Sequence, residues 1–256
     1  MKVLLTGSEG YIGKPLYCSL LESGVDVQCF DVFGSREEWL AYFNESVVGN
    51  DYDVVIHAGA MVHPQSVDPD IFFWNYEATV KLVDALDKSR FVYFSSNMAV
   101  DPVNFYGWSK LASERYIQSR LEDYCILRLL VVLGSGKRLT APSVADLLVE
   151  GKLGYIVDPY VRDYVYRDDV VAIAHNVVLH DKCVGDYDIG TGVGYSTFDL
   201  VNTWDDGSDF DVVAPKAGMV DSIVARPDYA YPNWEYVDVL DWIGDKRDVR
   251  EGRKIG

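Results

Sequence analysis

The stretch that decides the fold is Thr6-Gly7-Ser8-Glu9-Gly10-Tyr11-Ile12-Gly13. A short apolar run, Lys2 to Leu5, precedes it, and helical spacing of apolar residues from Tyr11 to Ser23 follows it. Glycines spaced in this way between a strand and a helix allow a tight turn, close approach of the backbone to a pyrophosphate, and close helix–strand packing. The amino terminus of such a helix faces the phosphate charge. The sequence therefore predicts a dinucleotide-binding turn made of Gly7, Ser8, Glu9, Gly10, Tyr11, Ile12 and Gly13.

An acidic residue follows the second expected strand, Val25 to Phe30. Asp31 at this position would accept hydrogen bonds from the adenosine ribose and repel a 2′-phosphate, which favours NAD over NADP. Arg36 lies just beyond and keeps NADP open, because an arginine there can hold a 2′-phosphate. A solvated carboxylate in a turn is the alternative interpretation of Asp31. NAD is the expected cofactor.

Strand and helix patterns continue to alternate through the first half of the chain. Further strands are expected at Asp53–Ile56, Phe91–Phe94 and Cys125–Leu129, and helices at Arg36–Phe43, Asp70–Lys88 and Gly107–Leu121. This alternation predicts an α/β fold with a doubly wound parallel Rossmann sheet, which binds ligands at the carboxyl ends of its strands. After Gly134 the pattern becomes less regular. We expect residues 1–134 to form the dinucleotide-binding core with the catalytic residues, and residues 135–256 to form mainly a small C-terminal substrate-binding lobe, interleaved with the core.

A candidate catalytic set lies at the edge of this expected sheet. Ser96 ends the strand that begins at Phe91, and Tyr106 and Lys110 share one face of the next helix because they are four residues apart. A free tyrosine titrates near ~10. A neighbouring ammonium, joined by the positive nicotinamide ring, would favour the phenolate and lower that pKa. Ser96, Tyr106 and Lys110 thus predict hydride transfer at a hydroxyl-bearing carbon, although a Tyr–Lys pair by itself also occurs on helix surfaces.

Composition and charge argue against several other classes of protein. The 256 residues carry a net charge of −17, which disfavours nucleic acid as a partner. No apolar run approaches the ~18 residues of a membrane span, and the amino terminus reads as a strand and not as a signal peptide, so we expect a cytoplasmic protein. The four cysteines are scattered, which argues against a disulfide framework and against a metal site. They are Cys18, Cys29, Cys125 and Cys183.

These motifs together resemble the extended short-chain dehydrogenase/reductase family, of the NAD-dependent nucleotide-sugar epimerase/dehydratase type. The likeness runs in order through Thr6–Gly13, Asp53–Ala60, Asn75–Thr79, the catalytic positions, Leu127–Leu129, Arg162–Tyr166, Asp188–Gly192 and Arg226–Asp228. It implies further cofactor contacts from His57, Ala58, Gly59, Asn75, Ser95, Tyr106 and Lys110. It also implies that Ser96, Arg162 and Arg226 bind the substrate, with the two arginines at its pyrophosphate.

The chain is similar to a shortened member of this family. Gly34 to Val54 is too short a stretch for the usual third strand and its adenine-contacting acid, and the connection from Ser96 to Tyr106 is also short. Val131 stands where many sugar-nucleotide members have asparagine. Asn97-Met98 replaces the Asp-Glu pair of the dehydratases, which argues against dehydration.

The resemblance implies an NAD-dependent epimerase that acts on a nucleotide-linked sugar through a transient 4-keto intermediate. An NAD(P)-dependent reductase of a keto sugar or a small carbonyl compound is the alternative, favoured by Val131 and the short loops. A non-catalytic dinucleotide-binding or redox-sensing protein is a third hypothesis. The resemblance further implies a homodimer that packs through Glu77–Lys88 and Ser109–Leu121.

Overall fold

The computed structural model describes residues 1–31, 34–63, 67–134, 143–181, 183–204, 209–215 and 222–250. The chain divides into two compact units. The first comprises Met1–Arg128 and Val171–Tyr187, and the second comprises Leu129–Val170 and Asp188–Gly256. The chain therefore leaves the first unit, returns to it for one segment, and ends in the second.

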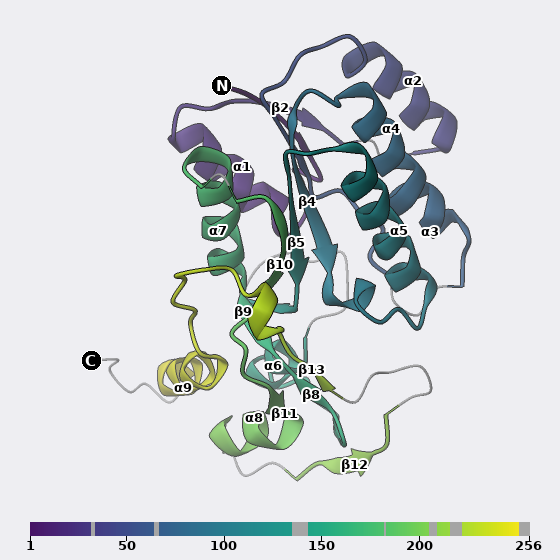
Figure 1. Cartoon of the computed structure of the whole chain (residues 1–256). Coiled ribbons are helices and arrows are strands. Elements are labelled where there is room, and N and C mark those ends of the chain that lie inside the picture. The colour runs from purple at the N-terminus through teal and green to yellow at the C-terminus, as the bar shows by residue number, and fades with distance from the viewer. Residues whose placement is uncertain are drawn as a thin grey trace. The chain divides into compact units, whose positions relative to one another are not determined.

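The central sheet belongs mainly to the first unit (Figure 1). Among the described residues it has six strands in the order β10-β5-β4-β3-β1-β2. The strands are β1 (Lys2–Thr6), β2 (Asp26–Phe30), β3 (Val54–His57), β4 (Arg90–Ser96), β5 (Tyr124–Leu129) and β10 (Gly185–Ile189). The pairs β1–β2, β1–β3 and β3–β4 are parallel. Parallel strands joined by helices bury both faces of a sheet, which accounts for the continuous apolar runs of β1 and β3.

Helices cover both faces of this sheet, as Figure 1 shows. On one face lie α1 (Gly13–Glu22) and α7 (Arg167–Leu179), and on the other lie α2 (Arg36–Ser46), α4 (Ala78–Ala85) and α5 (Phe105–Arg120). The core against α4 and α5 includes Leu82 and Ile117, packed with Val55 and Phe91 of the sheet. The doubly wound Rossmann architecture predicted from the sequence is therefore confirmed.

The third strand of a full-length Rossmann half is missing from the described residues. Strand β2 is the edge of the sheet, and the next described element is α2. Ser35 begins α2 with a capping box, accepting from the Glu38 N–H while the Glu38 carboxylate accepts from the Ser35 N–H. The chain then continues directly to β3, as the short stretch from Gly34 to Val54 predicts.

The helix predicted over Asp70–Lys88 is interrupted by a π-helical turn. Its parts are α3 (Asp70–Phe72), η1 (Phe73–Glu77) and α4. The carbonyl of Asn75 accepts hydrogen bonds from Thr79 Oγ at 2.5 Å and from Ser113 Oγ at 2.9 Å. These two hydroxyls satisfy the backbone carbonyl of Asn75 within the wider turn. Asn75 therefore lies where the regular helix is interrupted.

The second unit consists of short elements around a separate apolar core. Before its return to the first unit the chain forms β6 (Val131–Leu133), α6 (Val144–Val149), β7 (Tyr155–Val157), β8 (Val161–Arg162) and β9 (Tyr164–Tyr166). Afterwards it forms β11 (Tyr195–Ser196), α8 (Thr197–Trp204), β12 (Asp211–Val213), β13 (Ser222–Ile223), the single turn η3 (Pro227–Tyr229) and α9 (Val239–Arg250). Tyr164, Leu200, Trp204 and Ile243 are buried at its centre. Elements of two or three residues give little periodicity, so the sequence predicts this part poorly.

None of the helices in the described ranges combines the length and the apolar character that crossing a membrane requires.

Candidate active site

The glycine turn after β1 has a backbone that side chains cannot follow. Gly7 has a φ of +76°, and a Cβ placed on it would lie 2.6 Å from the Gly59 nitrogen. A Cβ on Gly13, the first residue of α1, would lie 2.0 Å from the Gly7 carbonyl oxygen. Only glycine therefore lets α1 start directly over the ends of β1 and β3. The turn leaves backbone N–H groups and the amino terminus of α1 at the sheet edge, an arrangement that fits a dinucleotide pyrophosphate.

Asp31 braces this turn from the end of β2. Its carboxylate accepts hydrogen bonds from the Gly7 N–H, from the Ser8 hydroxyl, and from the Glu9 N–H at 3.2 Å. The carboxylate is thus fixed beside the turn and is not a solvated turn residue. This is the place from which a carboxylate can reach an adenosine ribose.

Arg36, which kept NADP open at the level of the sequence, has partners within the protein. Its Nη2 donates to Asp70, and its guanidinium lies 4.6 Å from the centre of the Phe73 ring. A 2′-phosphate would have to compete with the Asp70 carboxylate for this arginine.

His57 ends β3, and its buried side chain is the middle member of a chain of hydrogen bonds. The Gly59 N–H donates to Thr6 Oγ at 3.0 Å, and Thr6 Oγ lies 2.7 Å from His57 Nδ1. On the other side His57 Nε2 lies 3.0 Å from Thr79 Oγ, which donates to the Asn75 carbonyl. Since Thr79 donates its hydrogen onward, the chain assigns the proton of His57 to Nε2.

This environment keeps His57 neutral. Burial, together with the charge of Lys110, lowers the pKa of His57 to about 3. A role of His57 toward a cofactor would therefore come from its backbone, which carries the chain into Ala58 and Gly59.

Asn75 supports the segment that follows β3. Its Oδ1 accepts from the Met61 N–H at 2.7 Å, and its Nδ2 donates to the Met61 carbonyl at 3.1 Å and to Ser109 Oγ at 3.0 Å. Both amide hydrogens are therefore used inside the protein. A direct contact with a cofactor could use only the remaining acceptor capacity of Oδ1.

The three predicted catalytic residues are assembled where β4 ends and α5 begins. Ser96 ends β4 and starts the single turn η2 (Asn97–Ala99), where its Oγ accepts from the Met98 N–H at 3.2 Å. A Cβ on Gly107 would lie 2.5 Å from the Met98 carbonyl oxygen, so glycine allows α5 to start against η2. This approach brings the buried Tyr106 phenol near enough to Ser96 for the Ser96 hydroxyl to influence its pKa.

In the protein alone, burial works against the lowering of the Tyr106 pKa that Lys110 and a nicotinamide ring together are expected to cause. Burial raises the pKa of Tyr106 to about 12, and the nearby Ser96 hydroxyl opposes this rise only in part. Lys110 Nζ donates to the Phe94 carbonyl at 2.8 Å and lies 4.6 Å from the centre of the Tyr93 ring. Burial also lowers the pKa of Lys110 to about 7, with Glu114 opposing that shift, so at neutral pH this amine is only partly charged.

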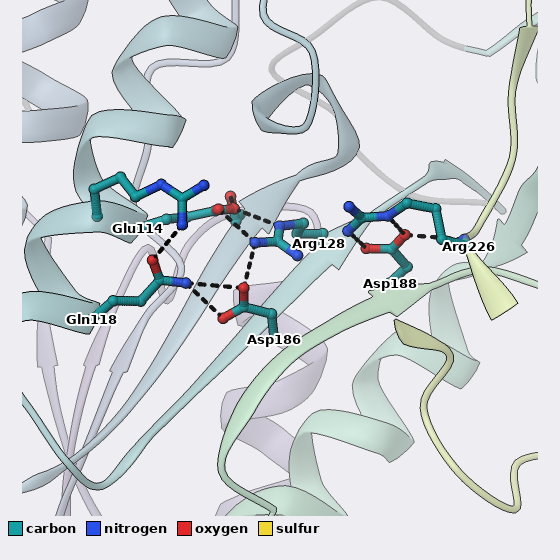
Figure 2. Close-up of polar contacts among 8 residues, drawn as sticks. Glu114, Gln118, Arg128, Asp186, Asp188 and Arg226 are labelled. Atoms are coloured by element: carbon teal, nitrogen blue, oxygen red, sulfur yellow. Dashed lines mark hydrogen bonds and ion pairs between the residues drawn. The ribbon is translucent and has the colours of Figure 1, made fainter. Parts of the chain in front are cut away.

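A polar network that joins Glu114, Gln118, Arg128 and Asp186 is not predicted by the sequence (Figure 2). Ser95, predicted as a cofactor contact, donates its hydroxyl to Glu114 Oε1 at 2.5 Å. Arg128 binds Glu114 through Nε at 2.9 Å and Nη2 at 2.8 Å, and Nη2 also binds Asp186 at 2.6 Å. Gln118 Nε2 donates to both oxygens of Asp186. The one signal in the sequence is that Glu114 follows Lys110 by four residues, on the same helix face.

The two arginines predicted to bind substrate lie in the second unit. Arg162 is buried, donates to the Val161 carbonyl at 2.7 Å, and stacks 3.6 Å from the centre of the Tyr160 ring. Arg226 forms a two-pronged pair with the buried Asp188, with both N–O distances at 2.7 Å (Figure 2). Each guanidinium is held in a defined orientation before any phosphate binds.

Asp163 is a further organising residue of the second unit that the sequence did not single out. Its buried carboxylate accepts from the backbone N–H groups of Thr191, Gly192 and Ala225 at 2.9, 2.8 and 3.1 Å. Burial raises the pKa of Asp163, and these hydrogen bonds oppose the rise. Asp163 therefore ties the turn after β10 to the residue that precedes Arg226.

Residues 3–190 match the family described as the NAD dependent epimerase/dehydratase family. The chain belongs to this family. It is therefore an NAD-dependent enzyme, which confirms the resemblance found in the sequence and the expected cofactor.

The proteins that resemble this chain are named for different reactions. A UDP-glucose 4-epimerase of Lactobacillus helveticus is 24% identical over 88% of each chain. A UDP-2-acetamido-2,6-beta-L-arabino-hexul-4-ose reductase of Pseudomonas aeruginosa is 30% identical, over 48% of this chain and 32% of the reductase. The structure of a UDP-glucose 4-epimerase of Thermotoga maritima with UDP-glucose has a TM-score of 0.78 at 21% identity, over 98% of this chain and 99% of that one. That likeness shows the shared fold.

Proposed function

We propose that this enzyme is an epimerase of a nucleotide-linked sugar and works through a transient 4-keto intermediate. The observation that carries the proposal is the placement of Ser96, at the carboxyl end of β4, where its hydroxyl acts on the buried Tyr106 phenol, with Lys110 on the same helix as Tyr106. The relatives from L. helveticus and T. maritima are named as epimerases of this kind, which supports the choice of reaction.

In this proposal the first unit holds the cofactor with residues whose geometry suits it. The turn from Gly7 to Gly13 takes the pyrophosphate, Asp31 takes the adenosine ribose, and the backbone from His57 to Gly59 lines the cofactor. NAD supplies a reversible hydride acceptor when it is bound. Asn75 and Ser95 act by fixing the neighbouring segments, since both are engaged within the protein.

Tyr106 is the proposed base and Ser96 the group that orients the reacting oxygen. The phenolate removes the proton of the C4 hydroxyl as the C4 hydrogen leaves as hydride, and Ser96 donates a hydrogen bond to the oxygen that becomes the ketone. The keto sugar then turns, and Tyr106 returns the proton to the C4 oxygen of the epimer. Lowering the pKa of Tyr106 from about 12 to neutral requires the phenolate to be stabilised by roughly 7 kcal/mol. The charge of protonated Lys110 and a positive nicotinamide ring are the proposed sources.

Arg162 and Arg226 are the proposed ligands of the substrate pyrophosphate. In an enzyme with a net charge of −17, an anionic substrate needs local cations. A guanidinium that is already oriented by Tyr160 or by Asp188 would lose little freedom on binding phosphate.

The test is an assay with a panel of nucleotide sugars and added NAD, following C4 stereochemistry by NMR and NADH by absorbance. The proposal expects interconversion of C4 epimers without net NADH change. Tyr106→Phe should abolish turnover and leave NAD binding intact, whereas Tyr116→Phe, on the same helix and bonded to the exposed Asp84, should leave turnover unchanged. In parallel reactions supplied with NADH and the corresponding keto sugars, steady, stoichiometric consumption of NADH without interconversion of C4 epimers would overturn the proposal.

A reductase of a keto sugar is the second candidate. The supporting observations are the 30% identity with the P. aeruginosa reductase and Val131 at a position where a polar substrate contact is common among sugar-nucleotide enzymes. It predicts that NADH or NADPH is consumed in proportion to substrate and that the cofactor exchanges freely. The same assay separates the two reactions.

A further inference from the structure

Cys125 and Cys183, which are 58 residues apart in the sequence, have their sulfur atoms 3.1 Å from each other. Cys125 lies in β5, and Cys183 comes just before β10, the neighbour of β5 in the sheet. We propose that these two thiols are a modification site, at which a small-molecule disulfide oxidises them to an intramolecular disulfide bond. The sulfur atoms need to approach by only about 1 Å to reach the ~2.0 Å of a disulfide.

Arg90 of β4 holds the two segments that carry these cysteines. Its Nη1 binds Asp123, two residues before Cys125, at 2.7 Å. Its Nη2 donates to the carbonyls of Asp181 and Cys183 at 3.2 and 2.7 Å. The Arg90 side chain is only 12% exposed. One guanidinium thus holds the backbone segments next to both cysteines. The contact between the sulfur atoms is therefore part of the fold.

The two thiols differ in a way that assigns their roles. Cys183 is partly exposed, and its contact with the Cys125 sulfur, aided by the charge of Arg90, lowers its pKa in spite of burial. Cys125 is fully buried, and its hydrogen bond to Cys183 together with burial raises its pKa. Cys183 is therefore the thiolate that a reagent meets first, and Cys125 is the thiol that completes the bond.

The chemistry balances with a small-molecule disulfide as the oxidant. The Cys183 thiolate attacks one sulfur of that reagent, forming a mixed disulfide and releasing one thiolate. The Cys125 sulfur then loses its proton, attacks Cys183 Sγ and releases the second thiolate. The released thiolates take up the two protons, so two protein thiols and one reagent disulfide give one protein disulfide and two small thiols.

The bond would close a loop that contains all of Leu129–Val170, the first segment of the second unit. A cross-link over a loop of this length restricts the unfolded chain more than the folded one. We expect the melting temperature to rise by roughly 5–10 °C on oxidation and to return on reduction.

The experiment treats the full-length reduced protein with oxidised glutathione and measures intact mass and cross-linked peptides. The expected result is the loss of two hydrogen atoms at Cys125 and Cys183, whether or not the exposed Cys18 gains a glutathionyl group, together with a peptide that joins Cys125 to Cys183 and the rise in melting temperature. Dithiothreitol should reverse all three. Cys125→Ser should instead retain one glutathionyl group on Cys183, and Cys183→Ser should leave Cys125 unmodified.

Cys18→Ser is the matched control, because Cys18 is exposed and outside the pair, and it should form the Cys125–Cys183 bond as wild type does. The wild-type mass measurement does not depend on whether the cysteine variants fold. A wild-type protein that gains only glutathionyl groups, or that keeps both thiols free under oxidation, overturns the proposal. So does a cross-link between any other pair of cysteines.

Discussion

Glu114 and Arg128 form a two-pronged ion pair inside the first unit, with Nε–Oε1 at 2.9 Å and Nη2–Oε2 at 2.8 Å. The Glu114 side chain is 1% exposed and that of Arg128 is 5% exposed. The pair joins α5, which carries Tyr106 and Lys110, to β5, and Glu114 also accepts from Ser95, the neighbour of the proposed catalytic Ser96. The helix that carries the proposed catalytic residues is therefore joined to the sheet by a salt bridge that touches neither substrate nor cofactor in our proposal.

Removing one partner of this pair should be costly. Arg128→Met leaves the Glu114 carboxylate buried without its cation, and we expect a loss of about 3–5 kcal/mol in the free energy of unfolding, measured with urea. Arg120→Met is the matched control, since Arg120 pairs at 3.4 Å with Asp84 and both side chains are about half exposed. Its loss should be at most about 1 kcal/mol. Equal losses in the two variants would contradict a special role for the buried pair.

The burial of Lys110 predicts a pH dependence of stability. Its pKa falls to about 7 in the folded protein, whereas the unfolded chain has an ordinary lysine value, so the unfolded state binds more protons between these values. The stability of wild type relative to Lys110→Met should therefore rise with pH above 7, by up to about 1.4 kcal/mol per pH unit. Urea titrations of both proteins from pH 6.5 to 9 measure this. A constant difference across the range would show that Lys110 keeps an ordinary pKa.

Local patterns in the sequence are sufficient to predict the strand, turn and helix of the proposed cofactor site. Gly7, Gly10 and Gly13 between a strand and a helix, and the short stretch from Gly34 to Val54, each predict a feature that lies within a few residues. The π-helical turn at Asn75 is not predicted by local spacing, and one of the two hydroxyls bonded to the Asn75 carbonyl, that of Ser113, comes from another helix.

Contacts between distant segments account for the other differences. The sequence indicates that Lys110 can lie beside Tyr106. It does not indicate that the Lys110 ammonium donates to the Phe94 carbonyl, or that burial raises the pKa of Tyr106 more than a nearby charge lowers it. It also gave no sign that Cys125 would meet Cys183, since no spacing rule connects a strand with a residue 58 positions later. Such pairings are set by sheet order, which emerges only when the whole unit folds.

The side chain of His57 should remain neutral over the whole physiological range. Its pKa is about 3, against an ordinary value of 6.5, so the unfolded state takes up a proton first as the pH falls below about 6.5. The wild type should lose stability relative to His57→Gln between about pH 6.5 and pH 3, and the loss should stop below that range. Nitrogen NMR of the imidazole checks the assignment directly. A single tautomer protonated at Nε2, with no titration from pH 8 to 5, is expected, and titration near 6.5 would refute it.

Asp31 should control the affinity for NAD through both the turn and the ribose. Asp31→Ala removes the acceptor for the Gly7 and Glu9 N–H groups and the Ser8 hydroxyl, and the proposed acceptor for the adenosine ribose. Hydrogen bonds to a charged group contribute about 1.5–3 kcal/mol, so we expect the Kd for NAD, measured by calorimetry, to rise roughly 10- to 100-fold. Asp26→Ala, an exposed residue at the start of the same strand, is the control and should bind NAD as wild type does. If Asp31→Ala keeps the wild-type affinity while its turn loosens in hydrogen exchange, then Asp31 serves the fold alone and its assignment to the ribose is wrong.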